Sequence, residues 1–189
     1  MVEQLTIQLI DGGSIPTSPL QLRVEVINKE MAHNIFRRWH YLGETDFIST
    51  IDFGASFDNR CVGALSFGSP NAKELYPYFD RHTQEGWYEI KRLAMEDECP
   101  KNSESRFIGI AIKLLRKAVK VRGIITYADS GVGHEGIIYR ATGFEYKGLT
   151  DKKSDFWVNG AIQQRGKTKG IYGEWKPRSQ KHLYVKVYG

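Results

Sequence analysis

The stretch that most constrains this chain is an apolar helix near its middle, between two strand-like segments. Glu104 to Lys120 has helical periodicity, and Pro100 with the polar residues NSES precedes it. Its polar stripe is narrow and basic, and apolar side chains cover the rest, which predicts a helix that packs against a sheet. The alternating segment before it, Trp87–Met95, and the short apolar segment after it, 123–129, are expected strands.

Further strands and helices alternate along the rest of the chain. Asn28 is placed to cap a helix over 28–42, after a strand over 20–27. The turn sequence FDNR joins two strands, 48–57 and 61–68, into a hairpin. The remaining expected elements are a short helix cut by Pro77 (71–79), a short helix (136–142) and two strands (144–148 and 155–159). This order, without internal repeats, predicts an α/β (α+β) fold with a mixed central sheet flanked by helices.

The glycines of ITYADSGVGHEGIIYRATGF (125–144) spell GxGxxG, the letters of a dinucleotide-binding fingerprint. That fingerprint belongs on the first strand of a βαβ unit, before a full-length helix and a ribose-binding acid. Here it follows residue 130, the helix after it spans two turns, and Asp155 does not end a second parallel strand. We therefore reject the dinucleotide interpretation. The segment is predicted to be a turn that lets Asp129 and Tyr139 face one pocket.

Length and composition favour one intracellular domain. The chain has 189 residues, of which 41% are hydrophobic, so a single domain over 1–189 is expected. No apolar run approaches about eighteen residues, and the start does not read as a secretory signal, so neither a membrane span nor secretion is expected. Cys61 and Cys99 suit neither a disulfide framework nor a zinc pair, and we expect two buried or half-buried thiols in a reducing compartment.

Positive charge gathers in two places. The net charge is +5, and the segment 160–189 is predicted to be a basic C-terminal segment because Glu174 is its single acid among seven Lys and Arg. Tyr172, Trp175 and Tyr184 are interleaved with these cations, a pattern that suits stacked bases beside held phosphates. The second basic site is FRRWHY, near residue 40. Together they favour contact with nucleic acid.

The strand ending in YAD, the short helix carrying Tyr139 and the GF that enters the next strand resemble the C-terminal half of the GNAT acyltransferase superfamily. The resemblance implies a GNAT-like fold whose fourth and fifth strands splay apart around the thioester of an acyl-CoA such as acetyl-CoA. The pyrophosphate would bind at the N-terminus of the helix after the fourth strand. KNSESRFIG lacks the usual Q/R-x-x-G-x-G/A pattern, so the cofactor contacts are predicted instead from Asn102, Ser103, Ser105 and Arg106.

Five strings together, WHYL, EIKRLAM, PKNSESRF, YADSGVGHEGIIYRATGFEYKG and PRSQKHLYV, look like the phage Mom family of DNA-modifying proteins, from about residue 35 onward. The resemblance implies an enzyme that transfers a small acyl or carbamoylmethyl-type group to the exocyclic amine of adenine in double-stranded phage DNA. This would happen in the host cytoplasm and shield the DNA from restriction enzymes.

The same resemblance leaves the donor and the reaction class open. It implies acyl-CoA or another acyl or aminoacyl donor, and an association with iron. Two alternatives remain. One is an ordinary GNAT N-acyltransferase acting on a small amine, a protein or an RNA. The other is a phage nucleic-acid-binding protein without catalysis.

His40, Asp129 and Tyr139 are the catalytic candidates that the resemblance implies. Asp129, at the end of a strand, is a base or hydrogen-bond acceptor for a poorly nucleophilic amine, or alternatively a turn-capping residue. Tyr139 matches the tyrosine that protonates a departing thiolate. His40 ends a basic helix between Trp39 and Tyr41, where a flipped adenine could be held by stacking.

The remaining site predictions concern DNA and metal. Contacts with the DNA substrate are predicted for Arg37, Arg38, Tyr41, His134, Lys176, Arg178 and Lys181, and the C-terminal lysines are expected to contact phosphates diffusely. Arg92 is a lesser candidate for substrate contact, with an ion pair to Glu89 as the default. A mononuclear iron would favour His and carboxylate ligands, and His40, Asp129 and His134 are the available trio. No close H-x-D spacing supports that trio, so the metal ligands stay unassigned.

Overall fold

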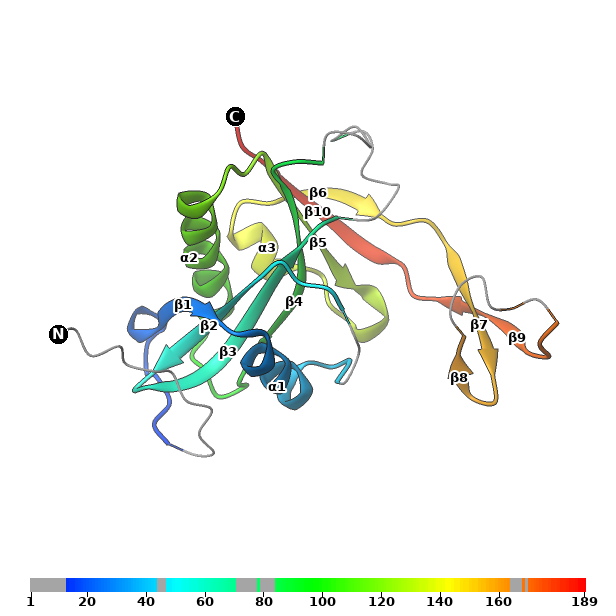
Figure 1. The fold of residues 1–189 in the computed structure, drawn as a ribbon, viewed down its shortest axis with the longest axis horizontal. Coiled ribbons are helices and arrows are strands. Elements are labelled where there is room, and N and C mark those ends of the chain that lie inside the picture. The colour runs from blue at the N-terminus through cyan, green and yellow to red at the C-terminus, as the bar shows by residue number, and fades with distance from the viewer. Residues whose placement is uncertain (1–12, 44–46, 71–77, 79–83, 164–167, 169) are drawn as a thin grey trace.

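A seven-stranded mixed sheet forms the body of the protein (Figure 1). The computed structural model describes residues 13–43, 47–70, 78, 84–163, 168 and 170–189. Every neighbouring pair of strands is antiparallel except β4 and β5, which are parallel. In spatial order the strands are β1 (Arg23–Ile27), β2 (Ile51–Phe57), β3 (Arg60–Gly68), β4 (Trp87–Met95), β5 (Gly123–Asp129), β10 (Lys181–Val187) and β6 (Glu145–Leu149).

Two helices cover opposite faces of this sheet. The 3-10 turn η1 (Pro19–Gln21) precedes β1, and α1 (Lys29–Trp39) follows it, capped by the Asn28 side chain as predicted. Its apolar face packs on Cys61 and Ala64 of β3. Their neighbours Val62 and Leu65 belong to the main core, together with α2 (Ser103–Ala118). Since successive strand residues point to opposite faces, α1 and α2 lie on different sides of the sheet.

Most of the expected elements are present. The central helix predicted over 104–120 is α2, and the hairpin predicted around FDNR joins β2 to β3. Asp58 and Asn59 supply its turn, with φ of 50° and 62°, a left-handed conformation that these two residue types tolerate. The strand predicted over 20–27 begins only at Arg23. The helix predicted over 71–79 falls almost wholly outside the described residues.

The parallel pair β4 and β5 opens along its length, as the fold resemblance predicted. The two strands pair only from Trp87 and Gly123 to Glu89 and Ile125. Immediately afterwards the register of β4 against β3 shifts, so that Lys91 is an extra residue in a β-bulge. The two strands continue to Met95 and Asp129 without pairing with each other, so they separate along this stretch.

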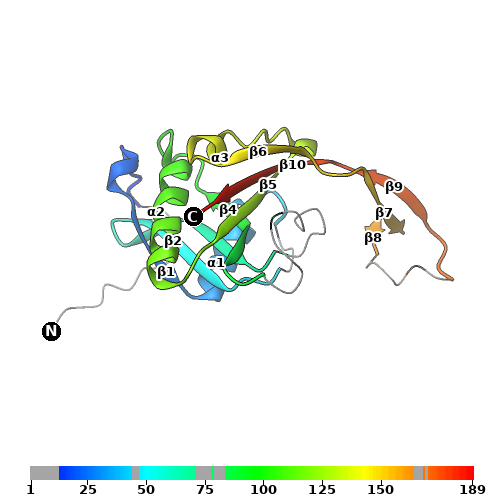
Figure 2. The same ribbon diagram turned by 90° about the horizontal axis from the view of Figure 1, so that it is seen from above.

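The basic segment 160–189 contributes to two different sheets. β10 lies in the body between β5 and β6. The preceding residues belong to a separate three-stranded sheet, ordered β8 (Ala161–Ile162), β7 (Lys153–Val158) and β9 (Glu174–Arg178). We call the described residues 153–163, 168 and 170–178 the arm, because Figures 1 and 2 both show this sheet reaching away from the body. Neither β9 nor β10 was predicted from the sequence.

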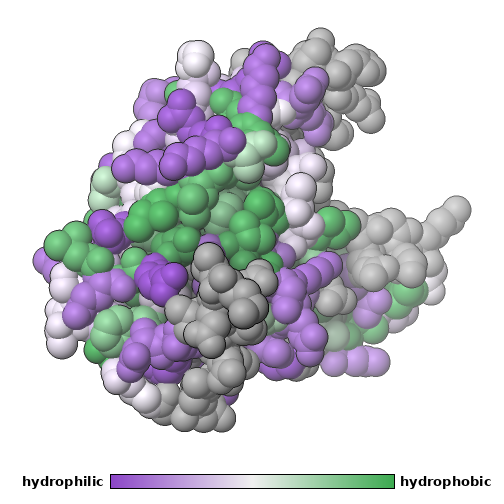
Figure 3. Space-filling model, turned by 60° about the vertical axis from the view of Figure 1, so that its left-hand side comes forward, coloured by the Kyte–Doolittle hydropathy of each residue, from purple (hydrophilic) through white to green (hydrophobic). Residues whose placement is uncertain are grey.

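The surface and the cysteines complete this description. Figure 3 turns the α2 side of the body forward and shows apolar residues gathered at its centre, bordered by hydrophilic ones. Over the described parts of the chain, no helix is long and apolar enough to cross a membrane. Cys61 is buried and Cys99 is half-buried, both as free thiols, as predicted.

Candidate active site

A cavity of about 530 Å³ occupies the gap between β4 and β5. The end of α1, the loop after β5, α3 (Ile137–Ala141) and the first turn of α2 complete its walls. Seven of the residues predicted for the site line it: His40, Tyr41, Arg92, Asp129, His134, Tyr139 and Lys181. Residues far apart in the sequence therefore converge on one pocket of a size suited to a small ligand.

Asp129 is fixed as an anion at the end of β5. Its Oδ1 accepts hydrogen bonds from the Gly131 amide at 2.9 Å and from the Ser179 hydroxyl at 2.6 Å. Partial burial raises its pKa, but these two hydrogen bonds and the nearby Lys181 and His134 outweigh burial and lower it overall. The Lys181 ammonium lies 3.9 Å from Oδ2. The geometry therefore favours a hydrogen-bond acceptor over a strong base.

Glycines of the GxGxxG motif allow the backbone of the loop after β5 to turn. Asp129 caps the 3-10 turn η3 (Ser130–Val132), which Gly133 ends with a φ of 75°. Gly136 precedes α3 with a φ of 70°, and a Cβ there would lie 2.3 Å from the ring of Tyr184. The Tyr184 hydroxyl donates to the Glu135 carbonyl at 2.5 Å. Glycine is required because the loop packs directly on the β10 tyrosine.

Tyr139 reaches the cavity from α3 and stays protonated. Its ring packs against Phe144 and Tyr184, with ring centroids 5.9 Å and 5.6 Å away. Burial raises the pKa of Tyr139 to about 12. The neighbouring Thr126 hydroxyl lowers this pKa, although it makes no hydrogen bond of normal geometry, and the charge of Glu104 raises it. A buried, protonated phenol is a hydrogen-bond donor and a potential acid.

His40 is held as a neutral imidazole. It follows the last turn of α1, and its Nδ1 accepts a hydrogen bond from the Leu42 amide at 3.2 Å. Burial, followed by the charges of Arg92, His134 and Lys181, lowers its pKa to about 4. Because Nδ1 is the acceptor, the proton of the neutral ring is assigned to Nε2. His40 therefore offers the cavity a donor rather than a base.

An aromatic surface borders the same side of the cavity. The His40 ring stacks on Tyr41 with centroids 4.5 Å apart and planes inclined by 27°. Tyr41 in turn meets His134 edge-on at 5.4 Å. The Arg92 guanidinium lies 5.2 Å from the centre of the Phe47 ring. Flat rings and a guanidinium are the groups that hold an unstacked base.

Glu104 is a cavity residue that the sequence analysis missed. It lies in the first turn of α2 and lines the pocket. Desolvation raises its pKa, whereas His134 lowers it. A signal was present in the sequence: Glu104 shares a helix face with Phe107, Ile108 and Ala111, so it is a lone acid at the start of an apolar face.

The residues predicted to hold the phosphates of acyl-CoA lie outside the cavity lining. The Ser103 hydroxyl donates to the Pro100 carbonyl at 2.6 Å, and that of Ser105 donates to the Asn102 carbonyl at 3.1 Å. Asn102 caps α2 in a left-handed conformation without a side-chain hydrogen bond. Among the described residues, Nε of Arg106 is buried without a hydrogen-bond partner. The two serine hydroxyls are therefore already used within the helix start.

Those observations decide how a CoA-type donor fits. The cavity suits a small acyl group and the thiol end of its carrier. The uncapped start of α2 leaves backbone N–H groups for an anion, but the Glu104 carboxylate sits in the same turn and opposes one. The reactive end fits, and the phosphates would rely on backbone groups.

An iron site is not supported. Within the ranges that the structure describes, no three His, Cys, Asp or Glu side chains come together to hold a metal ion. The trio of His40, Asp129 and His134 lines one cavity but does not form such a group, and Nδ1 of His40 and Oδ1 of Asp129 already make other hydrogen bonds. No step of the reaction is derived through iron.

The predicted DNA contacts are spread over the surface. Arg37 and Arg38 are exposed at the end of α1. Lys176 lies on β9, where it pairs with Glu174 at 2.6 Å, and Arg178 lies 4.0 Å from Asp155. Glu89, the predicted default partner of Arg92, pairs with Lys91 at 2.9 Å.

Comparison with known proteins identifies the family. The model of the Mom protein family matches residues 21–184. The chain belongs to the Mom family. It is 30% identical over 143 residues to the methylcarbamoylase Mom of Escherichia phage Mu. The aligned region covers 73% of this chain and 58% of the phage Mu protein. The chain thus spans less than two thirds of the length of that relative.

Solved structures show the fold. A Bacillus subtilis acetyltransferase in complex with CoA has a TM-score of 0.56 at 11% identity, covering 88% of this chain and 99% of that one. The Escherichia coli ribosomal-protein-S18-alanine N-acetyltransferase has a TM-score of 0.57 at 8% identity, covering 88% and 93%. A GNAT family acetyltransferase from Elizabethkingia anophelis with acetyl-CoA bound has a TM-score of 0.53 at 11% identity, covering 89% and 99%. The Mom-family chain has the GNAT-like fold that its sequence predicted.

Proposed function

We propose that this Mom-family protein is a transferase that places a small acyl or carbamoylmethyl-type group on the exocyclic amine of adenine in double-stranded phage DNA. The observation that carries the proposal is the cavity between β4 and β5 in a chain of this family, with Asp129, Tyr139 and His40 on its walls. The similarity to the phage Mu methylcarbamoylase supports it. The modified DNA would resist restriction enzymes in the host cytoplasm.

The adenine is held by the aromatic wall. The amine of a paired adenine donates to thymine and cannot enter an enclosed cavity while the base is stacked, so the base leaves the duplex before the reaction. Tyr41 supplies a stacking surface, and Nε2 of His40 donates to a ring nitrogen of the base. A neutral donor suits this role because, with a pKa of about 4, its charge does not change between about pH 5 and neutral pH.

Asp129 and Tyr139 manage the protons. The Asp129 carboxylate accepts a hydrogen bond from the exocyclic N–H and orients the nitrogen toward the donor. Once the nitrogen has bonded to the donor carbon it becomes strongly acidic, so even a carboxylate of lowered pKa takes its proton. The Tyr139 phenol gives its proton to the leaving group.

The donor is of the acyl-CoA type, in keeping with the CoA and acetyl-CoA complexes of proteins that share the fold. It would supply the electrophilic carbon. Its carrier chain would follow β4 beside the bulge at Lys91, and the backbone N–H groups at the start of α2 would receive its phosphates. Another acyl or aminoacyl carrier remains the alternative for this part of the site.

Mass spectrometry of DNA nucleosides tests the proposal. The protein is expressed with a plasmid in Escherichia coli, and the plasmid is digested to nucleosides. A deoxyadenosine of increased mass is expected from the wild type and is lost with Tyr139→Phe. Tyr188→Phe is the matched control, because this hydroxyl lies outside the cavity lining. Unmodified plasmid from soluble wild-type protein contradicts the function, and modification by Tyr139→Phe contradicts the assigned role of the phenol.

A further inference from the structure

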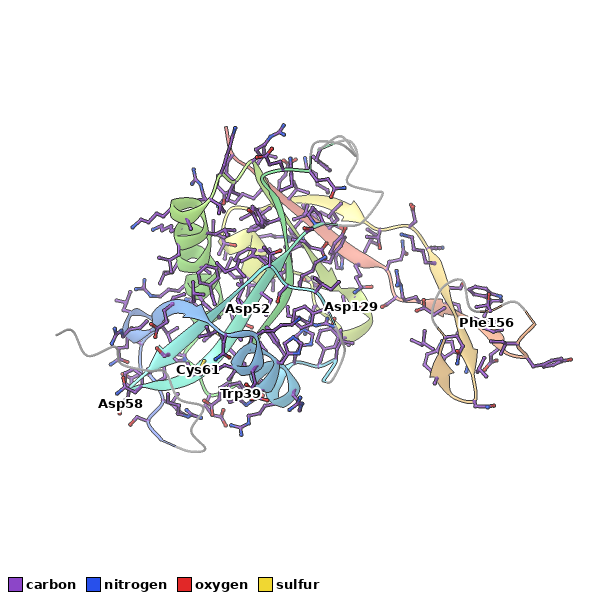
Figure 4. All side chains as sticks on the ribbon, viewed as in Figure 1. Trp39, Asp52, Asp58, Cys61, Asp129 and Phe156 are labelled. Carbon is purple, nitrogen blue, oxygen red and sulfur yellow. The ribbon has the colours of Figure 1, made fainter. Side chains whose placement is uncertain are left out.

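Several large apolar side chains of the arm are exposed to solvent. Tyr172 is fully exposed, Trp175 is 64% exposed and Ile162 is 56% exposed. Figure 4 shows the arm residue Phe156 well away from Asp129 in the body. Phe156 is buried and packs on Trp175, with ring centroids 5.2 Å apart. The arm thus has a small hydrophobic centre of its own and offers further rings to a partner.

The backbone next to the exposed Tyr172 is tightly packed. A Cβ on Gly173 would lie 2.4 Å from the Trp157 carbonyl oxygen and 2.8 Å from the Phe156 ring. The backbone after Tyr172 therefore lies directly on the arm, and glycine is what permits it. An exposed aromatic ring on an anchored backbone loses little freedom when it binds a partner.

Positive charge points to an anionic partner. By sequence, residues 153–178 include six Lys and Arg against two acids, a net charge of +4 out of +5 for the whole chain. Lys176 and Arg178 alternate with Trp175 along β9, so cations and ring lie on opposite faces of this strand. A small sheet that offers both cations and exposed rings suits a nucleic acid, which has anionic phosphates and flat bases.

The base of the arm is tied to the cavity. The Gln180 amide donates to the Thr150 carbonyl at 2.6 Å, joining the two chain segments that lead into the arm. The next residue back, Ser179, donates to Asp129, and Ser130 donates to the Gln180 carbonyl at 2.6 Å. Side chains at the foot of β9 therefore help to hold the Asp129 carboxylate and its turn.

The length of β9 sets the reach of the arm. Trp175 lies four residues before Ser179 and Tyr172 lies seven, which at about 3.3 Å per residue gives about 13 Å and at most about 23 Å. These distances correspond to about four to seven base pairs along a duplex. That is too far to fill the space left by a flipped base, and it suits contact with the duplex beside it.

We propose that the arm is a β-ribbon clamp that grips double-stranded DNA beside the adenine held in the cavity, with Tyr172 at the groove and Lys176 and Arg178 at the phosphates. Its two longer strands, β7 and β9, form a ribbon of the width that the major groove admits, and β8 adds only two residues beside them. The inference rests on the proposed function for the cavity, and it adds the surface that positions the duplex. Binding of the duplex to the arm acts on Ser179 and Gln180, the residues next to β9 that hold Asp129 and its turn.

Fluorescence anisotropy of the full chain with a fluorescein-labelled DNA duplex of about two helical turns tests the clamp. Tyr172→Ala, which removes a fully exposed ring that would be buried against the duplex, is expected to weaken binding by roughly tenfold. The double variant Lys176→Ala, Arg178→Ala is expected to reduce the slope of log affinity against log salt by about 1.8, for two phosphates lost. The matched controls are Leu20→Ala, which is 73% exposed near β1, and Lys113→Ala with Lys117→Ala on α2.

The outcomes separate the clamp from the catalytic proposal. Affinity and salt slope unchanged in both arm variants overturn the clamp, even if the wild type modifies plasmid DNA. Equal arm-dependent binding to an RNA duplex of the same sequence, or an arm-dependent dimer with unchanged DNA affinity, also overturns it. If the wild type binds DNA through the arm but leaves plasmid adenine unmodified, the clamp stands and the catalytic proposal fails.

Discussion

The pKa of His40 gives the sharpest physical prediction about the cavity. An ordinary histidine has a pKa of about 6.5, and burial with the charges of Arg92, His134 and Lys181 lowers that of His40 to about 4. The folded state therefore resists protonation that the unfolded chain accepts. The free energy of unfolding contributed by this group falls as pH falls below the unfolded value, and the loss levels off below the folded one.

The magnitude follows from the shift. At about pH 5 the unfolded imidazole is protonated and the folded one is not. Without any screening, the free energy of unfolding at that pH is therefore about 2 kcal/mol lower than at neutral pH. The ring is partly exposed, and solvent screening reduces this to about 1 kcal/mol. Of the three charged neighbours, Arg92 has the largest effect on the pKa of His40. Replacing Arg92 with Met is therefore expected to raise that pKa.

Two-dimensional NMR of the His40 ring proton against pH measures the pKa directly, and urea unfolding at about pH 5 and at neutral pH measures the energy. His40→Gln should abolish about 1 kcal/mol of the pH dependence. Lys113→Met, which removes a charge from the outer surface of α2, is the control for Arg92→Met. An ordinary His40 pKa near 6.5, unaffected by Arg92→Met, would refute the assignment of a neutral donor.

Two further substitutions test the loop that carries the site. Ser179→Ala removes a charged hydrogen bond to Asp129 and should lower the free energy of unfolding at neutral pH by about 1 kcal/mol, while Ser154→Ala on the exposed side of the arm should not. Because the folded pKa of Asp129 is lowered, the effect should vanish as the carboxylate is protonated at strongly acidic pH, and an effect that persists there contradicts the mechanism. Gly136→Ala meets both a φ of 70° and an aromatic ring, and thermal unfolding should show a loss of about 2 kcal/mol or more. Gly148→Ala, with a φ of 99° in open space, should cost about half as much, and equal losses would show that only the backbone matters.

The body of the fold was predictable because its signals are local. Asn28, the FDNR turn and the apolar face of α2 each specify an element within a short stretch of chain. The strand β10 could not be predicted in the same way. It pairs with β5 and β6, which precede it by tens of residues, and KHLYVKV reads as part of a basic segment until its partners are known.

The site was predicted in part for a similar reason. Asp129 and Tyr139 flank one turn, so their convergence is a local property of the loop and α3. Glu104 and Lys181 reach the cavity through the packing of α2 and the insertion of β10. The lone acid on the apolar helix face singled out Glu104, but no local pattern shows that this face meets β5 and α3. The residues predicted for the phosphates lie at the start of α2 outside the cavity lining, where the Ser103 and Ser105 hydroxyls bond to nearby carbonyls.

The central claim is that the cavity between β4 and β5 modifies adenine and depends on the Asp129 carboxylate. The most direct measurement compares plasmid nucleosides from cells that express the wild type, Asp129→Asn and the control Asp58→Asn, whose residue lies in the β2–β3 turn away from the cavity. We predict a heavier deoxyadenosine from the wild type and from Asp58→Asn, and at least about a hundredfold less from soluble Asp129→Asn. Equal amounts of modified nucleoside from all three proteins would contradict the account.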